Sequence, residues 1–188
     1  KTSGCGLRVD PGRVEVDLWS FEAAAGRDDL QSLVKAADLY RGDLLEGFEP
    51  PEVNFQDWLS PEREQLRRRA LDILWRLYTR QRDSKAHDAA LATANRYLTA
   101  DPLCERMHAE VMRIHLARGY RTAALCHYRA ASEALAEDLE IEPGPDLVRL
   151  ADLARKGATG GIDATSCRGT AAACVRAART RRATGDPR

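Results

Sequence analysis

A short run of small residues recurs along this chain at a spacing of 34 positions, the difference between positions 89 and 123. The two copies are Ala89-Ala90-Leu91 and Ala123-Ala124-Leu125. Around each copy, and in the stretch before it, apolar residues lie three or four positions apart, which predicts two consecutive helical hairpins. The repeat therefore favours a fold in which similar pairs of helices stack along the molecule.

A period of 34 residues is also that of tetratricopeptide arrays. We therefore predict an all-α fold: a tetratricopeptide-like right-handed stack of about seven helices, with a short N-terminal β-hairpin remnant and a disordered C-terminal tail. Aromatic residues make up only 6% of the chain, which favours helices over strands. A plain helical bundle is the alternative. The side chains expected to pack the repeats are Leu74, Leu77, Ala90, Ala94, Tyr97, Val111, Ala124 and Tyr128.

Apolar spacing and capping residues predict where the helices begin and end. The first begins at about Asp17. Ser60-Pro61-Glu62 opens the helix with the strongest signal, because Ser caps a helix and Pro fits its first position. Further helices are expected at about 28–40, 85–99 and 146–156. Between them, one helix is expected to contain Leu103 and to end near Gly119, and the next to contain Ala124 and Leu139. Residues 41–54 form a loop, which is expected to lie against the helices through its apolar side chains, Leu44, Leu45 and Phe48.

The two ends of the chain differ from the helical part. Residues 1–16 hold two short runs of alternating apolar residues around Asp10-Pro11-Gly12, the pattern of a β-hairpin. Residues 157–188 are rich in Gly, Ala, Thr and Arg and contain few large apolar residues, so we expect a disordered basic tail. It can be interpreted as a linker or terminal extension, or as a nucleic-acid-binding segment; it has no aromatic residues interleaved with its arginines, and we prefer the first.

Composition and motifs argue against several functions. The formal net charge is zero, which gives no support for bulk affinity for nucleic acid. No apolar run is long enough to span a membrane, and the first ten residues lack the apolar stretch of a signal peptide, so a cytoplasmic protein is expected. Cys104 and His108 lie four apart, but zinc requires three or four ligands. We expect no metal, no cofactor and no catalytic site.

The tryptophans and one charged run are candidates for contact with partners. Trp19, Trp58 and Trp75 are expected in the core, but Trp75 lies beside the apolar stripe of its helix and is the best candidate for an interface aromatic. Arg67 and Arg68 belong to a charged run that is interpreted as a solvated face or as a docking surface. Glu64 and Arg68 are spaced for an i,i+4 ion pair.

Five motifs, taken together and in order, resemble the bacterial transcriptional activator domain of SARP-type regulators. The motifs are Val16-Asp17-Leu18-Trp19-Ser20-Phe21-Glu22, Tyr40-Arg41-Gly42-Asp43-Leu44-Leu45, Asp57-Trp58-Leu59-Ser60-Pro61-Glu62-Arg63, Ala100-Asp101-Pro102-Leu103, and Leu139-Glu140-Ile141-Glu142-Pro143-Gly144-Pro145-Asp146-Leu147. The resemblance covers about residues 14–156.

The resemblance implies a function and a division of the chain. It implies a helical module for protein contact and dimerisation in a transcription regulator, with the transcription machinery or a second copy as partners. In that family a winged helix-turn-helix domain precedes the module and binds DNA, so DNA contact is expected only through that domain. Residues 1–16 would be the remnant of its end, residues 17–156 the activator domain, and residues 157–188 the basic tail. A sensor that binds a small molecule or peptide in its groove is the alternative.

Overall fold

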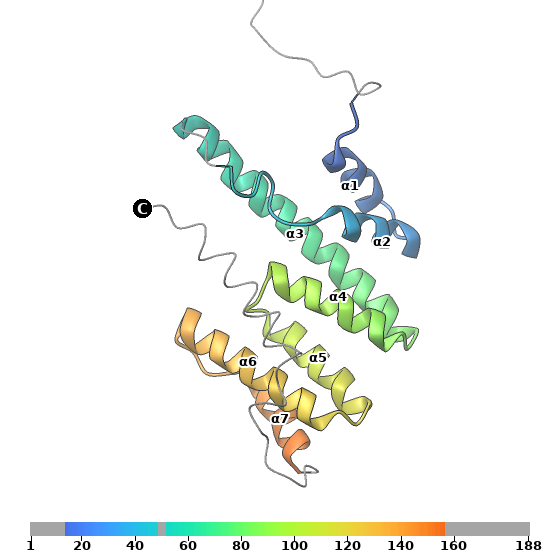
Figure 1. The fold of residues 1–188 in the computed structure, drawn as a ribbon, viewed down its shortest axis with the longest axis vertical. Coiled ribbons are helices and arrows are strands. Elements are labelled where there is room, and N and C mark those ends of the chain that lie inside the picture. Colours follow the sequence, from blue (N-terminus) through green and yellow to red (C-terminus); the bar gives the residue numbers. More distant parts are fainter. Residues whose placement is uncertain (1–13, 49–51, 157–188) are drawn as a thin grey trace, which may run out of the picture.

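The computed structural model describes residues 14–48 and 52–156 (Figure 1). This part of the chain is all-α, as predicted, and contains no strand. The expected hairpin at 1–16 falls almost wholly outside the described residues, and the expected tail at 157–188 falls wholly outside them. The helices are α1 (Asp17–Ala25), α2 (Leu30–Leu39), α3 (Val53–Asp83), α4 (His87–Ala100), α5 (Glu105–Ala117), α6 (Arg121–Leu139) and α7 (Pro145–Arg155).

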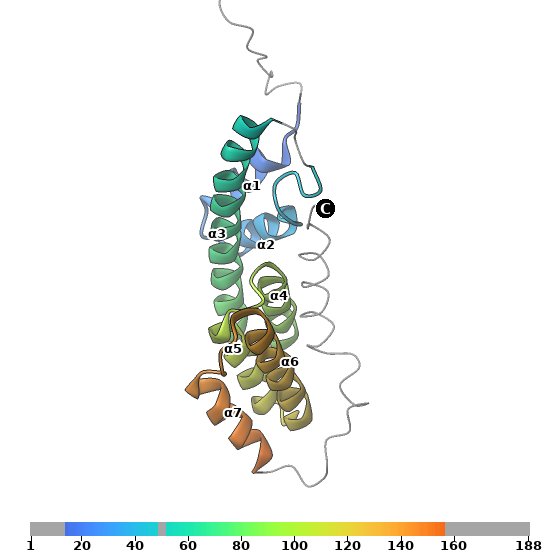
Figure 2. The ribbon, with the colours of Figure 1, turned by 90° about the vertical axis from the view of Figure 1, so that its left-hand side faces the viewer.

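The helices pack in the order in which the chain visits them. α1 packs on α2, α3 on α4, and α5 on α6, and each pair contacts the next, while α7 packs on both α5 and α6 (Figures 1 and 2). α4 begins at His87 and α6 begins at Arg121, which is 34 positions later. Ala90 and Ala124 occupy equivalent places in these helices and are both fully buried. The repeat in the sequence is therefore a repeat in the structure.

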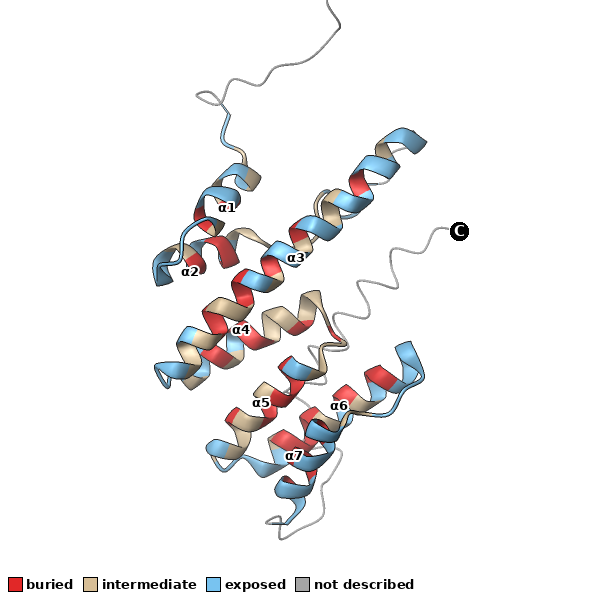
Figure 3. Cartoon of the chain, turned by 180° about the vertical axis from the view of Figure 1, so that it is seen from behind, coloured by how far each residue is buried: buried red, intermediate tan, exposed pale blue. Residues whose placement is uncertain are grey.

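Apolar side chains are buried along the whole stack (Figure 3). One cluster joins α1 and α2 to α3 through residues such as Leu33, Leu74 and Leu77. A second lies between α3, α4 and α5 around Tyr78, and a third holds α7 against α5 and α6 around Leu147. Each hairpin thus buries its apolar face against its neighbours, as expected for a repeat architecture.

α3 is much longer than its partner α4. It has 31 residues, against 14 in α4, and would extend about 46 Å at 1.5 Å per residue. Its N-terminal turns project beyond α4 and are mostly exposed (Figures 1 and 3). The first turns of α3 therefore form a protruding end of the molecule.

The prediction that this helix begins at Ser60-Pro61 is wrong, because α3 begins at Val53 and Pro61 lies inside it. A proline within a helix removes one backbone hydrogen bond. Here Pro61 is exposed, and Leu59 just before it is buried, so packing of the preceding turns favours helix on both sides of the proline. Ser60 does not cap a helix; its hydroxyl donates to the carbonyl of Gln56, one turn earlier, at 3.1 Å.

Among the described residues, no helix is both long enough and apolar enough to cross a bilayer.

Candidate interaction surfaces

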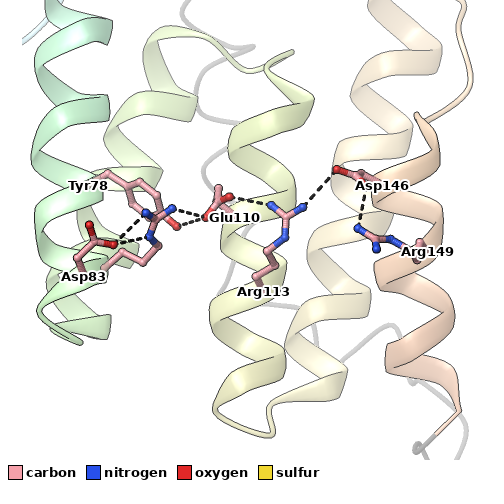
Figure 4. A network of polar contacts seen from close by, with 7 residues as sticks. Tyr78, Asp83, Glu110, Arg113, Asp146 and Arg149 are labelled. Carbon is pink, nitrogen blue, oxygen red and sulfur yellow. Dashed lines mark hydrogen bonds and ion pairs between the residues drawn. The ribbon is translucent and has the colours of Figure 1, made fainter.

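A network of polar side chains connects α3, α5 and α7 on one side of the stack (Figure 4). Glu110 lies at its centre and accepts hydrogen bonds from the Tyr78 hydroxyl and from Arg113, both at 2.7 Å. Arg113 also reaches Asp146 on α7, at 3.3 Å. Burial, followed by the hydrogen bond to Glu110, raises the pKa of Tyr78, so the phenol remains a donor. This network fixes the relative positions of the repeats.

Two buried histidines face each other across the seam between α5 and α6. His108 Nδ1 lies 2.8 Å from His127 Nε2, and His108 Nε2 lies 2.8 Å from the carbonyl oxygen of Pro102. Because a carbonyl can only accept, His108 carries its proton on Nε2 and its Nδ1 accepts from His127. His127 Nδ1 is then a buried acceptor without a partner in the described structure. This arrangement suits two neutral rings.

Trp75 on α3 is partly buried against α4 and α5. The guanidinium carbon of Arg106 lies 3.8 Å from the centroid of its ring, a cation–π contact. The centroids of the Tyr78 and Tyr97 rings lie 5.8 and 6.4 Å from the centroid of the Trp75 ring. Trp75 therefore has partners inside the chain, and its role as an interface aromatic stays a prediction.

The loop between α2 and α3 is bound to α3 by two arginines. Arg63 donates to the carbonyls of Leu44 and Leu45 at 2.7 and 2.6 Å. Arg67 pairs with Asp43, which also accepts a hydrogen bond from the Tyr40 hydroxyl at 3.3 Å. Burial, with the charge of Asp43, raises the pKa of Tyr40 to about 12. The loop is thus held against α3, as the sequence predicts.

A groove of about 360 Å³ opens between this loop, α3 and the end of α4. Its polar lining includes Tyr40, Arg67 and Arg96. The two arginines already pair with carboxylates of the chain, Arg67 with Asp43 and Arg96 with Asp38. The groove could hold a small ligand, but its cations are engaged in holding the fold.

Apolar side chains gather where the loop meets the protruding end of α3. Phe48, Val53 and Trp58 are 50%, 67% and 49% exposed. The ring of Phe55 lies 6.2 Å from that of Phe48 and 5.3 Å from that of Trp58. The three rings Phe48, Phe55 and Trp58, which we call the α3 aromatic patch, are in contact one with the next. Exposed apolar surfaces of this kind mark interaction sites.

Several expectations for apolar residues are wrong. Trp19 and Trp58 are exposed rather than in the core, and within the loop Leu44 packs on the core whereas Leu45 and Phe48 do not. Trp58 lies on the turns of α3 that project beyond α4, and Leu45 and Phe48 lie in the loop just before them. In the described part of the chain no other helix packs on these turns, and the side chain of Trp19 on α1 is likewise left 42% exposed.

The other candidate residues fall into two groups. Leu74, Leu77, Ala90, Ala94, Val111 and Ala124 are buried, and Tyr97 and Tyr128 are partly buried. Arg68 is exposed and forms the expected ion pair with Glu64, at 3.3 Å, while Arg67 is occupied by Asp43. Burial suits the first group to packing; a docking role for Arg67 and Arg68 stays a prediction.

Cys104 and His108 do not converge on a common point. The Cys104 thiol lies 3.8 Å from the Tyr97 hydroxyl, whereas His108 contacts His127 and Pro102. Within residues 14–48 and 52–156, no three His, Cys, Asp or Glu side chains are grouped to hold a metal ion.

Comparison with known families decides the classification. The model of the bacterial transcriptional activator domain matches residues 16–153, which is most of the chain and all seven helices except the end of α7. The chain belongs to the bacterial transcriptional activator domain family. No curated protein and no solved structure matches it. The family is one of transcription regulation and not an enzyme family, so this activator domain is a helical, transcription-related module.

Sequence reasoning missed the α3 aromatic patch as a site, although a signal for it was present. Between Arg41 and Arg63 the chain has no Lys or Arg, yet it has aromatic residues at positions 48, 55 and 58. The interpretation of Ser60-Pro61 as a helix start assigned residues 49–54 to the loop and hid the protruding helix. The His108–His127 contact was missed because nothing in the spacing pairs residues 19 positions apart on different helices.

Proposed function

We propose that residues 17–156 of this activator domain act as a protein-interaction module of a transcription regulator. The observation that supports this most is the α3 aromatic patch, an exposed apolar surface at the protruding end of α3. Arg63 and Arg67 hold the adjoining loop in place, so the patch is largely preformed before a partner arrives. A preformed surface loses little conformational entropy on binding.

The partners that we propose are proteins of the transcription machinery. DNA would be contacted through a winged helix-turn-helix domain, as the family resemblance implies, and this module would carry out no chemistry. The test is binding of purified RNA polymerase holoenzyme, and of its separate subunits, to the immobilised full chain. We expect at least one subunit to bind reversibly. Failure of the holoenzyme and of every subunit to bind would contradict the proposal.

A second copy of the chain is a further partner that we propose. The outer face of α7 exposes Val148 and Leu153, which line a shallow depression of about 550 Å³ together with Pro143 and Pro145. Apolar surface on a terminal helix of a stack suits a symmetric dimer. Sedimentation equilibrium should show a dimer that Leu153→Glu dissociates; a monomer at every concentration would refute self-association.

A ligand sensor is the second candidate function, and the groove beside Arg67 and Arg96 is the observation that favours it. If a small molecule or peptide binds there, it should raise the thermal midpoint of the chain, because ligands that bind only the folded state stabilise it. A stabilising metabolite, found together with no affinity for polymerase, would support the sensor over the interaction module.

A further inference from the structure

The segment that carries the α3 aromatic patch is acidic. Residues 42–62 contain six acidic residues and no Lys or Arg, within a chain whose formal net charge is zero. Asp43 is paired with Arg67. In the described part of the chain, Glu52, Asp57 and Glu62 form no ion pair. Within residues 14–48 and 52–156, these three carboxylates are therefore not neutralised by an ion pair.

Two of these acids flank Phe55 and Trp58 along the chain. Glu62 lies four positions after Trp58 on α3, so helical geometry places it beside that ring. Glu52 is the extended residue that directly precedes α3, three positions before Phe55 in the sequence. Phe48 extends the apolar surface from the loop through its contact with Phe55. The result is an apolar strip with a carboxylate at each end. A helix with an apolar face and basic residues beside it complements that surface.

Two occupants that the chain itself could supply fit less well. The segment 157–188 has six arginines, but its only large apolar side chains are Ile162 and Val175, too few to cover an aromatic strip. A second copy would bring one acidic strip against another. The arginines in the middle of α3 already pair within the chain, namely Arg67 with Asp43, Arg69 with Glu22 and Arg76 with Asp28.

We propose that the α3 aromatic patch binds a basic amphipathic helix of a partner protein. The apolar face of that helix packs on Phe48, Phe55 and Trp58, and its Lys or Arg side chains pair with Glu52 and Glu62. Arginines of the partner also stack on the rings. This inference rests on the proposed function and specifies the kind of partner.

The test uses the full chain and a fluorescein-labelled 18-residue peptide of Leu and Lys at helical spacing. We expect saturable binding by anisotropy that weakens as salt rises, and no binding of the same peptide with Glu in place of Lys. Trp58→Ala and the double variant Glu52→Gln/Glu62→Gln should each weaken binding at least tenfold, and the double variant should flatten the salt dependence. All substituted residues are exposed or partly exposed, so the fold should persist.

Matched controls lie elsewhere on the stack. Leu30→Ala removes a similarly exposed apolar side chain from α2, and Glu133→Gln/Glu142→Gln removes two exposed carboxylates from α6 and the segment before α7. These variants should bind the Leu/Lys peptide as the wild type does. Equal loss in the control and patch variants would mean that the peptide binds by general charge, and it would overturn the proposal.

Two further outcomes would also overturn it. A peptide of residues 168–182 that binds the patch as tightly as the Leu/Lys peptide would make the chain's own basic segment the occupant. A dimer that Trp58→Ala dissociates would make it a second copy. If polymerase binds the wild type and the patch variants equally, this inference fails while the proposed function stands. If polymerase binds neither the wild type nor the patch variants while the Leu/Lys peptide binds the patch, the proposed function fails and this inference about the patch does not.

Discussion

The contact between His108 and His127 places two ionisable rings where neither can be charged at low cost. Burial lowers the pKa of His108, against weaker opposing effects of the hydrogen bond to the Pro102 carbonyl and of the charges of Asp101 and Glu105. It lowers the pKa of His127 further, and the neighbouring His108 and His115 add to the effect. Protonation of His127 would place a proton on Nδ1, which has no partner in the described structure. The contact therefore stabilises the fold only while both rings are neutral.

This geometry predicts a loss of stability in mild acid. Each histidine binds its proton more readily in the unfolded chain, where its pKa is near 6.5. The stability is thus present above that pH and is lost as pH falls below it, by up to about 1.4 kcal/mol per pH unit for each ring. The urea midpoint should fall between about pH 7.5 and 5.5, above the usual range of carboxylates.

The variant His127→Gln isolates this effect, because its amide can still donate to His108 but does not titrate. It should flatten the pH dependence of the urea midpoint. An unaltered slope in His127→Gln would show that the buried contact is not its source.

At the scale of the helices, small residues set how closely each hairpin closes. Ala90 in α4 and Ala124 in α6 are both fully buried at equivalent places in the repeat. Larger side chains there have no space without moving a neighbouring helix. The spacing of the hairpins therefore depends on these two alanines.

Ala90→Leu and Ala124→Leu should each lower the free energy of unfolding by about 1–3 kcal/mol through overpacking. Ala89→Leu is the matched control, since Ala89 is exposed on the same helix, and it should change stability by less than about 0.5 kcal/mol. Urea denaturation measures all three. Wild-type stability in both buried variants would refute the close packing of the hairpins.

Pro61 distinguishes the helix that the structure shows from the one that the sequence predicts. Inside α3 it removes a backbone hydrogen bond, so Pro61→Ala should stabilise the domain, by up to about 3 kcal/mol. At a helix start, proline is favoured and the same change would be neutral or destabilising. Thermal unfolding separates the two outcomes, with Gln65→Ala as the exposed control on the same helix.

The sequence predicts the helices that recur in the repeat, but it does not predict the features that occur only once in the chain. The 34-residue spacing and apolar periodicity gave the all-α class and the hairpin pairing, because packing between similar helices is encoded in local patterns. The start of α3 could not be obtained in this way, since Ser60-Pro61 follows the rules for a helix start and proline is disfavoured inside a helix. The exposure of Trp58 follows from that same protruding turn, and burial cannot be inferred until the neighbours of a helix are known.

The whole molecule is a stack of hairpins with one end different from the rest. Polar contacts around Glu110 and the buried histidines hold the middle of the stack together. The end formed by the 42–48 loop and the first turns of α3 instead exposes aromatic side chains, together with acids that form no ion pair among the described residues. This division suits a domain in which the repeats provide rigidity and one end contacts other proteins.

The most direct test of this division is hydrogen exchange of the full chain with and without RNA polymerase holoenzyme, read by mass spectrometry. The account predicts slower exchange for backbone amides in residues 42–62 when polymerase is present, and unchanged exchange in α5 and α6. Protection confined to α5 and α6, or no protection in residues 42–62 at saturating polymerase, would contradict it.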